Sequence, residues 1–377
     1  MSALQSHLVS KTRSDLNVAT ILLAGGKGTR LHELTAAESK PAVHFAGRNR
    51  IVDFAMANIV RSGLDRLVVA TQFAPATLHD HLPARWDGHF ASGAMILKDG
   101  RDTYLGTADA VRHNWAQVED WGSDQVLVVA ADHIYDMDYA PLIAAHKASG
   151  AAVTVAVDVV PVTAASGFGV MQTDTSGRIL SFLEKPAHPP AIPGDPDHAM
   201  VSMGIYVFEA DWLRDALFGR DIASLDFGHE VIPAAVAQGL AMSYRLPAGP
   251  SGHTYWRDVG TLESLRLSHL DFVGQQPARL PRASTLSEWY LGRGSVAMPG
   301  ALVPTSARLT RCLVAPGTKV PAGLVVGEDP DEDDLWFRRD RGTVLITQAM
   351  LDRREAVRVP VSLHVATRPV LQSRDVA

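Results

Sequence analysis

Short runs of apolar, β-branched residues recur along the first 275 residues of the chain. Four such runs occupy residues 18–23, 66–70, 125–130 and 151–160. They contain little polar alternation, which is typical of strands that are buried on both faces of a sheet. Apolar residues at helical spacing lie between them, at residues 51–61, 108–118 and 139–148. This alternation predicts an α/β fold, in which helices cover both faces of a mostly parallel sheet.

The pattern changes near residue 275. Residues 275–287 are polar, contain prolines and show no clear period, which predicts a linker. Apolar residues then recur at a spacing of six, in two sets: Val296 and Leu302, and Val314, Val320 and Val326. This spacing is typical of a β-helix, in which short strands stack coil upon coil. The repeat is long enough for only a coil or two.

Composition narrows the class of protein. Apolar residues make up 46% of the 377 residues, and 35 basic side chains face 41 acidic ones, which excludes intrinsic disorder and gives no basic excess for nucleic-acid binding. The single cysteine, Cys312, excludes a disulfide framework and a thiolate metal cluster. The acidic cluster at residues 328–334 is predicted to be a solvated surface loop. No apolar run is long enough to span a membrane, so we expect a cytoplasmic protein.

A glycine-rich loop follows the first predicted strand directly. Gly25, Gly26 and Gly28 leave backbone N–H groups free to face a phosphate, and Lys27 and Arg30 add positive charge. The loop matches neither the dinucleotide-binding fingerprint nor the Walker loop. Its position and charge favour phosphate binding over the alternative, an ordinary strand-to-helix turn.

This loop and a set of later segments resemble a known enzyme family. The sequences ILLAGGKGTRL (residues 21–31) and KPAVHFAG (residues 40–47) are similar to the nucleotide-binding signature of sugar-1-phosphate nucleotidyltransferases. Seven further segments resemble the ADP-glucose pyrophosphorylase branch: YLGTADAV (104–111), ADHIY (131–135), SGFGVM (166–171), FLEKP (182–186), SMGIYVF (202–208), DFG (226–228) and YWRDVGT (255–261). They occur in the order found in the family and cover residues 18–273.

The resemblance implies a fold, a domain organisation and a reaction. We expect an N-terminal extension (1–17), a Rossmann-like nucleotidyltransferase domain (18–275), a linker (276–291) and a shortened left-handed β-helix with a C-terminal tail (292–377). The sheet of the nucleotidyltransferase domain is expected to be mixed and mostly parallel, with helices on both faces. The implied reaction joins ATP to glucose 1-phosphate, with Mg²⁺ as cofactor, giving ADP-glucose and pyrophosphate. It requires cations on the phosphates, carboxylates for the metal and a cleft for both substrates.

The resemblance also implies site residues. The catalytic residues would be Arg30, Lys40 and Asp132, and the metal ligands Asp132 and Asp258. The nucleotide-binding residues would be Leu23, Ala24, Gly25, Gly26, Gly28, Thr29, Gln72, Tyr104, Gly106 and Thr107. The residues that bind the sugar phosphate would be Gly169, Glu184, Lys185, Ser202 and Asp226.

Taken without the resemblance, several of these residues have ordinary structural explanations. Asp132 is equally well explained as a helix N-cap, and Asp258 as the ion-pair partner of a neighbour such as Arg257. Glu184 and Lys185 precede a proline and would be read as a solvated turn. Asp136 and Asp138 are predicted to cap the helix that begins at Tyr139.

The sequence departs from the family in two places. Many activated bacterial members carry basic residues between Thr35 and Lys40, where this chain has Ala-Ala-Glu-Ser. We therefore expect weak or no activation by sugar bisphosphates, because Glu38 would repel a phosphate. The β-helix is also shorter than in the family, whose members are homo-tetramers. A shorter stack buries less surface, so a homo-oligomer is expected while its tetrameric form is left open.

Two other functions stay open at this point. The enzyme could use another nucleoside triphosphate or another sugar 1-phosphate, since base choice depends on pocket shape. A non-catalytic regulatory subunit that binds sugar phosphates is the second alternative. The presence of Arg30, Lys40, Asp132, Lys185 and Asp258 argues against it, because a regulatory subunit has no need of a metal pair.

Overall fold

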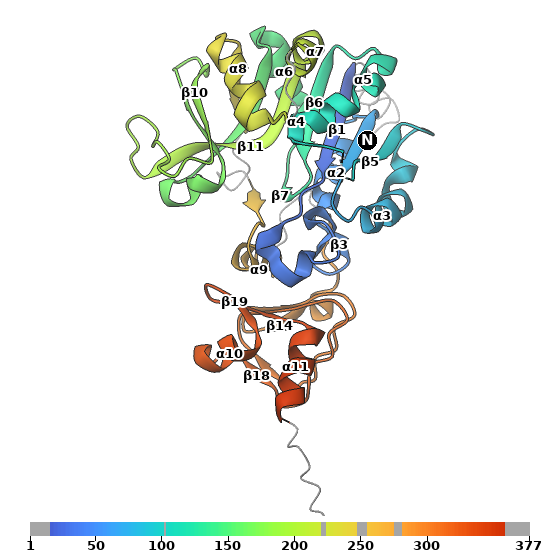
Figure 1. Cartoon of the computed structure of the whole chain (residues 1–377), viewed down its shortest axis with the longest axis vertical. Coiled ribbons are helices and arrows are strands. Elements are labelled where there is room, and N and C mark those ends of the chain that lie inside the picture. The colour runs from blue at the N-terminus through green and yellow to red at the C-terminus, as the bar shows by residue number, and fades with distance from the viewer. Residues whose placement is uncertain (1–15, 102, 220–223, 247–254, 275–280, 359–377) are drawn as a thin grey trace, which may run out of the picture.

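The computed structural model describes residues 16–101, 103–219, 224–246, 255–274 and 281–358. Figure 1 shows a large α/β part above and a smaller C-terminal part below. Most of the expected N-terminal extension and the first residues of the expected linker lie outside the described residues.

A nine-stranded mixed sheet forms the centre of the large part. Its parallel half contains, in spatial order, β5 (Met95–Asp99), β4 (Leu67–Thr71), β1 (Val18–Ala24) and β6 (Gln125–Ala130). The other half is built on β11 (His198–Glu209), which is antiparallel to β6, β8 (Val153–Pro161) and β9 (Gly169–Thr173). The edge strands are β10 (Ile179–Glu184), antiparallel to β9, and β12 (Ala241–Arg245), parallel to β8. The predicted α/β fold is confirmed, with an antiparallel half that the strand pattern did not indicate.

Helices pack on both faces of this sheet, as predicted. One face carries α2 (Val52–Arg61), α3 (Ala76–Trp86) and α6 (Tyr139–Ser149). The other face carries α4 (Thr107–His113), α5 (Trp115–Trp121), α7 (Ala210–Phe218) and α8 (Ile232–Ala237). The prediction of one helix over residues 108–118 was wrong, because the chain breaks at Asn114, whose side-chain amide donates to the Ala110 carbonyl and the Tyr104 hydroxyl. Asp138 caps α6 as predicted, whereas Asp136 pairs with Arg61.

The C-terminal part is a short β-helix. Its first face holds the parallel strands β15 (Ser295–Ala297), β17 (Cys312–Val314) and β20 (Thr343–Ile346), and its second face pairs β16 (Arg308–Leu309) with β18 (Val325–Val326). A bridge between Leu302 and Lys319 marks the third face. Val296, Val314, Val320 and Val326 are buried in the β-helix, whereas Leu302 is 61% exposed.

Two hairpins and two helices complete the C-terminal part. β14 (Tyr290–Gly292) pairs with β15, and β19 (Arg338–Asp340) pairs with β20. The acidic cluster was wrongly predicted as a loop, because most of it forms α10 (Pro330–Trp336). The Asp329 side chain caps this helix. The acidic residues in its first turn stabilise it, because they lie at the positive end of the helix dipole. The last described helix is α11 (Gln348–Arg358).

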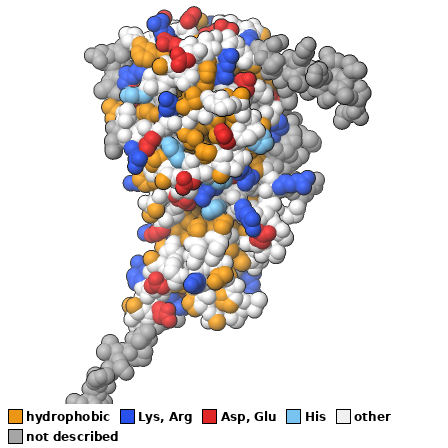
Figure 2. Space-filling model, turned by 90° about the vertical axis from the view of Figure 1, so that its right-hand side faces the viewer, with side chains coloured by type: hydrophobic (Ala, Val, Ile, Leu, Met, Phe, Trp, Pro, Cys, Tyr) orange, Lys and Arg blue, Asp and Glu red, His pale blue; other side chains and the backbone are white. Residues whose placement is uncertain are grey.

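An apolar cluster joins the two parts. It contains Leu262 and Leu265 of α9 (Leu262–Leu270), Phe45 of β2 (His44–Phe45) and the β-helix residues Val296 and Leu345. β2 forms a hairpin with β3 (Asn49–Arg50). On the face shown in Figure 2, acidic and basic side chains are interspersed over both parts of the molecule. In the described part of the chain, each helix is too short or too polar to cross a lipid bilayer.

A buried histidine in this junction predicts loss of stability in acid. The His269 ring is 1% exposed and packs 4.2 Å from the Phe45 ring centroid, and its Nδ1 shares a hydrogen bond with the Leu265 carbonyl. Burial lowers the pKa of His269 to about 4, so the folded protein holds it neutral. The unfolded chain would bind a proton near pH ~6.5, so this contribution to stability is lost as the pH falls from there towards 4.

Because of His269, we expect the free energy of unfolding to be lower at pH 5 than at pH 7 by about 2 kcal/mol. Urea unfolding at the two pH values should show a smaller decrease for His269→Gln than for the unsubstituted protein. The exposed His188 provides the control, since His188→Gln should leave the decrease unchanged. An equal decrease in all three proteins would contradict the prediction.

Candidate functional site

Two cavities meet at the carboxyl ends of β1 and β6. The first, which we call the loop cavity, has a volume of about 990 Å³ and lies beside the glycine-rich loop. The second, the inner cavity, has about 380 Å³ and lies between that loop and the β9–β10 hairpin. Gly26 and Asp132 line both cavities. A ligand in one cavity would therefore reach a ligand in the other at Asp132.

A lysine bridges two aspartates at this meeting point. Lys40 Nζ lies 3.1 Å from Asp132 Oδ2 and 3.0 Å from Asp258 Oδ1. Asp132 follows β6, and Asp258 ends β13 (Trp256–Asp258), which pairs with β7 (His133–Tyr135). Lys40 belongs to a short 3-10 turn after the glycine loop, where its N–H donates to the Gly26 carbonyl. Three residues far apart in the sequence thus form one charged cluster.

The charges of this cluster stabilise one another. Burial alone would raise the pKa of Asp132, but Lys40 and His133 hold it well below its usual range. Burial alone would lower the pKa of Lys40, but the two carboxylates raise it above its usual value. The lysine is 4% exposed and stays positively charged, and the carboxyl of Asp132 stays ionised.

Asp132 does not have the structural role that remained open from the sequence, and Asp258 pairs with Lys40 and not with Arg257. Asp132 precedes a strand and not a helix, so it is not an N-cap. Arg257 pairs with Asp271 at 2.8 Å, which leaves Asp258 to Lys40. In the described part of the chain, no group of three or more His, Cys, Asp or Glu side chains is arranged to hold a metal ion. A divalent cation here would depend on two carboxylates together with oxygen atoms from a ligand and water.

The residues present fit such a cation. Lys40 contacts one oxygen of each carboxylate, so an ammonium group already lies between the two side chains. Mg²⁺ prefers carboxylate oxygens, usually one or two, and completes its shell with water and phosphate. The Asp132 side chain is 32% exposed and that of Asp258 20%, so both are accessible from the inner cavity.

The glycine loop approaches its neighbours too closely for larger side chains. Gly28 has a φ of 66°, and a Cβ there would lie 2.6 Å from Lys40 Cβ. A Cβ on Gly25 would lie 2.9 Å from Gln72 Cβ. Thr35 Oγ1 donates to the Gly28 carbonyl at 2.9 Å and so fixes the end of the loop. These close approaches hold the loop against Lys40 on one side and Gln72 on the other.

Most residues predicted to bind the nucleotide line the loop cavity. They are Leu23, Gly25, Gly26, Gln72, Tyr104, Gly106 and Thr107. Gln72 Nε2 donates to the Tyr104 carbonyl at 2.7 Å. This hydrogen bond connects the residue after β4 with the segment before α4. Three predicted residues lie elsewhere. Gly28 and Thr29 line the inner cavity, and Ala24 is fully buried in the core below the loop.

Most residues predicted to bind the sugar phosphate line the inner cavity. They are Gly169, Glu184, Lys185 and Ser202, together with Arg30, Lys40, Asp132 and Asp258. Lys185 has a φ of 45°, and its Nζ lies 2.7 Å from Glu184 Oε1. The structure places the fifth predicted residue, Asp226, in the loop cavity, where it accepts a hydrogen bond of 2.7 Å from Thr107 Oγ1.

The two cavities also include residues that the sequence did not single out. His133, Phe168, Tyr206 and Gly260 line the inner cavity, and Phe73 and Arg101 line the loop cavity. The first four stand inside the family-like segments, so their motifs carried a signal. Phe73 and Arg101 lie outside those segments and had none.

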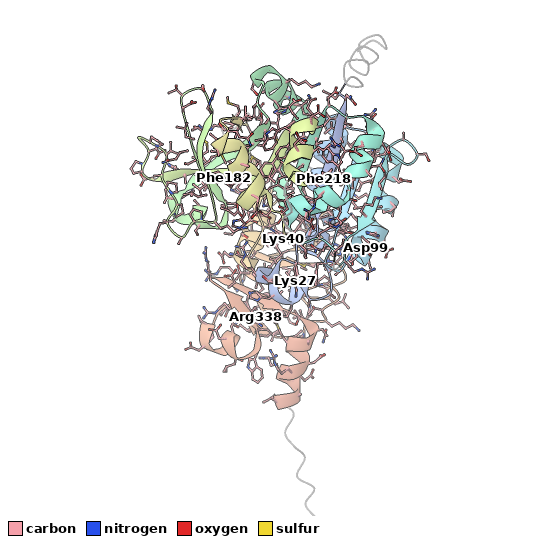
Figure 3. The ribbon with its side chains drawn as sticks, turned by 45° about the horizontal axis from the view of Figure 1, so that its top comes forward. Lys27, Lys40, Asp99, Phe182, Phe218 and Arg338 are labelled. Carbon is pink, nitrogen blue, oxygen red and sulfur yellow. The ribbon has the colours of Figure 1, made fainter. Side chains whose placement is uncertain are left out.

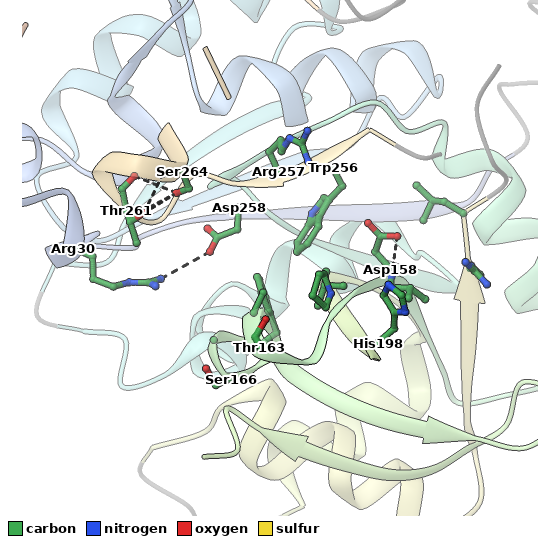
Figure 4. A pocket seen from close by; sticks show the side chains of 18 of the residues that line it. Arg30, Asp158, Thr163, Ser166, His198, Trp256, Arg257, Asp258, Thr261 and Ser264 are labelled. Atoms are coloured by element: carbon green, nitrogen blue, oxygen red, sulfur yellow. Dashed lines mark hydrogen bonds and ion pairs between the residues drawn. The ribbon is translucent and has the colours of Figure 1, made fainter. Parts of the chain in front are cut away.

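A third cavity, the outer cavity, lies beside the inner one and has a volume of about 1260 Å³. Figure 4 shows its wall near Arg30, Asp258 and the first turn of α9. Arg30 lies 4.0 Å from Asp258 Oδ2 and is 62% exposed. Its guanidinium borders both cavities and is free to contact an anion between them.

The segment between Thr35 and Lys40 has an internal ion pair. Glu38 Oε2 lies 3.1 Å from Arg50 NH1, and both side chains are largely buried. Ala36 and Ala37 line the loop cavity. Arg50 thus neutralises the one charge that this segment carries.

Comparisons with known proteins agree with this arrangement. Residues 19–273 match the nucleotidyl transferase family, and residues 282–347 match the family described as GlmU-like, C-terminal hexapeptide. The chain is 38% identical to the glucose-1-phosphate adenylyltransferase of Jannaschia sp. (strain CCS1), over 88% of this chain and 96% of that relative. It is 37% identical to the enzyme of the same name from Cereibacter sphaeroides (strain ATCC 17025), over 88% and 95%. It is 38% identical to the enzyme of the same name from Roseobacter denitrificans, over 88% of this chain and 96% of that relative.

Proposed function

Since the chain belongs to the nucleotidyl transferase family and, within it, to the glucose-1-phosphate adenylyltransferases, we propose that it transfers the adenylyl group of ATP to α-D-glucose 1-phosphate. The products would be ADP-glucose and pyrophosphate, and the reaction would serve glycogen or α-glucan synthesis. A cytoplasmic location and a homo-oligomeric state are part of this proposal.

The single observation that carries the proposal is the Lys40 bridge between Asp132 and Asp258 at the meeting point of two cavities. A transfer between two substrates needs their reacting atoms side by side, with charge compensation at the point of contact. We assign the loop cavity to the nucleoside and the inner cavity to the sugar phosphate. Their volumes, about 990 and 380 Å³, suit a larger and a smaller substrate.

Each residue of the inner cavity has a separate role in the proposed transfer. In the inner cavity, Lys185 would hold the phosphate of the sugar, and Glu184 and Ser202 would accept or donate hydrogen bonds at its hydroxyl groups. A phosphate oxygen of the sugar then attacks the α-phosphorus of ATP, and the bond between the α-phosphorus and the bridging oxygen breaks. The electron pair leaves with pyrophosphate, so no covalent nucleophile of the protein is needed.

Lys40 supplies a fixed positive charge where negative charge accumulates. Its N–H is bound to the Gly26 carbonyl and its Nζ to two carboxylates, so the ammonium needs no reorganisation during the reaction. Asp132 and Asp258 would hold Mg²⁺, which, when bound, neutralises charge on the phosphate oxygens. Loop N–H groups and Arg30 would orient the leaving pyrophosphate.

An assay of the purified chain tests the proposal. ATP, GTP, CTP, UTP and dTTP are each supplied with glucose 1-phosphate and Mg²⁺, and the release of pyrophosphate and the sugar nucleotide formed are measured. We expect ATP to be used in preference to the others and activity to stop when EDTA removes the metal. If the enzyme preferred another base or sugar phosphate, the proposed pair of substrates would be wrong. If no pair of substrates gave any transfer, the proposed function would be overturned.

A further inference from the structure

Arg30 and Asp258, which both line the inner cavity, are not attached to the central sheet. Ser202 stands on β11, Glu184 ends β10 and Asp132 follows β6, so the large sheet positions all three. Asp258, by contrast, ends β13, which belongs to a separate two-stranded sheet. Arg30 lies in η1 (Thr29–Thr35), a 3-10 segment outside any sheet. Their positions must therefore be fixed by something else.

The first attachment joins the segment of Asp258 to the β-helix. Two residues separate Asp258 from Thr261, which caps α9 through a reciprocal pair of hydrogen bonds with Ser264. Near the start of this helix, Glu263 Oε2 accepts hydrogen bonds from Thr343 Oγ1 at 2.8 Å and from Gly342 N at 3.1 Å. The Glu263 N–H donates to Asp340 Oδ2 at 3.2 Å. The start of α9 is thus bound to the hairpin of β19 and β20.

A buried arginine reinforces this attachment. Arg266, one turn further along α9, is 3% exposed, and its Nε donates to Thr343 Oγ1 at 2.7 Å. Thr343 is fully buried, so its hydroxyl both accepts from Arg266 and donates to Glu263 out of contact with water. Hydrogen bonds to charged groups in such surroundings are strong and directional. The Thr343 hydroxyl therefore fixes the register of α9 on the β-helix.

The second attachment joins the segment of Arg30 to the same hairpin. Glu33, three residues after Arg30, pairs with Arg338 of β19 at 2.9 Å. Figure 3 shows Arg338 in the C-terminal part, below Lys27 and Lys40. His32 lies between Arg30 and Glu33 in the sequence. It has a φ of 53° and a ψ of −122°, a conformation that costs free energy in any residue but glycine. The ion pair of Glu33 with Arg338 adds a contact with the β-helix beside this strained residue.

The two attachments converge on one pair of side chains. Arg30 and Asp258 face each other at 4.0 Å, as the dashed line in Figure 4 marks. A Cβ on Gly260 would lie 2.7 Å from the Arg30 guanidinium and 3.0 Å from both Asp258 carboxylate oxygens. The space for this pair is therefore closely fitted, and a small shift of either segment would change it.

We propose that the β19–β20 hairpin of the β-helix positions Arg30 and Asp258 for the transfer, with Thr343, Glu263 and Arg338 as positioning residues. This inference rests on the proposed function. It gives the short C-terminal part a direct role in the active site of the same chain. A hairpin that holds both groups acts on the rate of the chemical step, because misplacement by a fraction of an ångström costs most at the transition state.

Threonine substitutions in the full chain test the first attachment. Thr343→Val removes the hydroxyl and keeps the shape, and we expect kcat to fall about tenfold with little change in KM for either substrate. Thr343→Ser restores a hydroxyl and should restore most of kcat. The matched control is Thr318→Val, because Thr318 is also fully buried in the β-helix but its hydroxyl has no hydrogen-bond partner among the residues that the structure describes. If the two valine variants had the same kcat, the inference would be overturned.

A charge exchange tests the second attachment and does not depend on a buried site. Arg338→Glu should lower kcat severalfold, and the double variant with Glu33→Arg should recover it. Arg339 provides the control, since it pairs with Asp334 inside the C-terminal part, and Arg339→Glu should leave kcat unchanged. No recovery in the double variant, or an equal loss in the control, would count against the inference. An unsubstituted chain without transferase activity would instead overturn the proposed function.

Discussion

Asp132→Asn should lower the rate of ADP-glucose formation by about 10²-fold to 10³-fold. Asparagine keeps the shape of the side chain but removes its negative charge, so Lys40 would lose one of its two carboxylates. The proposed magnesium ion would lose one of its two proposed ligands. The loss should appear in kcat and should not be recovered at high Mg²⁺ concentration, because the amide oxygen is a weak ligand. Steady-state release of pyrophosphate measures it.

A nearby aspartate offers a matched control for this substitution. Asp138 caps α6 by accepting a hydrogen bond from the Ala140 N–H at 3.0 Å, and asparagine caps helices about as well as aspartate. Asp138→Asn should therefore keep both stability and kcat. If Asp132→Asn were as active as this control, the carboxylate pair would have no part in the reaction.

The elements that could be predicted from the sequence are those whose pattern is local. The buried strand at residues 18–23 and the helices at 51–61 and 139–148 appear within a residue or two of their expected bounds. Strand direction could not be predicted, since burial on both faces produces the same apolar run in parallel and antiparallel strands. The break at Asn114 was hidden because the apolar spacing continues through it. The helix of the acidic cluster was missed because its many acidic residues were taken to indicate a solvated loop. Asp329 and Pro330, which are typical of the first positions of a helix, were not given enough weight.

The candidate site depends on contacts that no local pattern encodes. Lys40 meets Asp132 and Asp258 across 92 and 218 positions of the chain, and only the family resemblance brought them together in advance. The same resemblance placed Asp226 with the sugar residues, whereas the structure has it beside Thr107 in the loop cavity. Motifs identify residues that act together. Which side of a cleft each one faces depends on how the loops between strands pack, and that is a property of the folded chain.

Gly28→Ala should impair both folding and catalysis. The φ of 66° at Gly28 is unfavourable for alanine and would cost about 1–2 kcal/mol of stability. The added Cβ would also lie 2.6 Å from Lys40 Cβ, and this atom belongs to a residue whose backbone is bound to the Gly26 carbonyl. Lys40 would have to move, which would take its ammonium out of the bridge between the aspartates. We expect kcat to fall about 10²-fold.

A second glycine separates the two effects. Gly150, which ends α6, has a φ of 65°, but a Cβ there would meet no other part of the described chain within 4 Å. Gly150→Ala should therefore show only the loss of stability that comes from the unfavourable φ, about 1–2 kcal/mol in urea unfolding, with an unchanged kcat. The difference in kcat between the two variants would measure the effect of displacing Lys40 alone. If Gly28→Ala kept the kcat of Gly150→Ala, the close contact between the glycine loop and Lys40 would serve folding and not the placement of charge at the reacting phosphate.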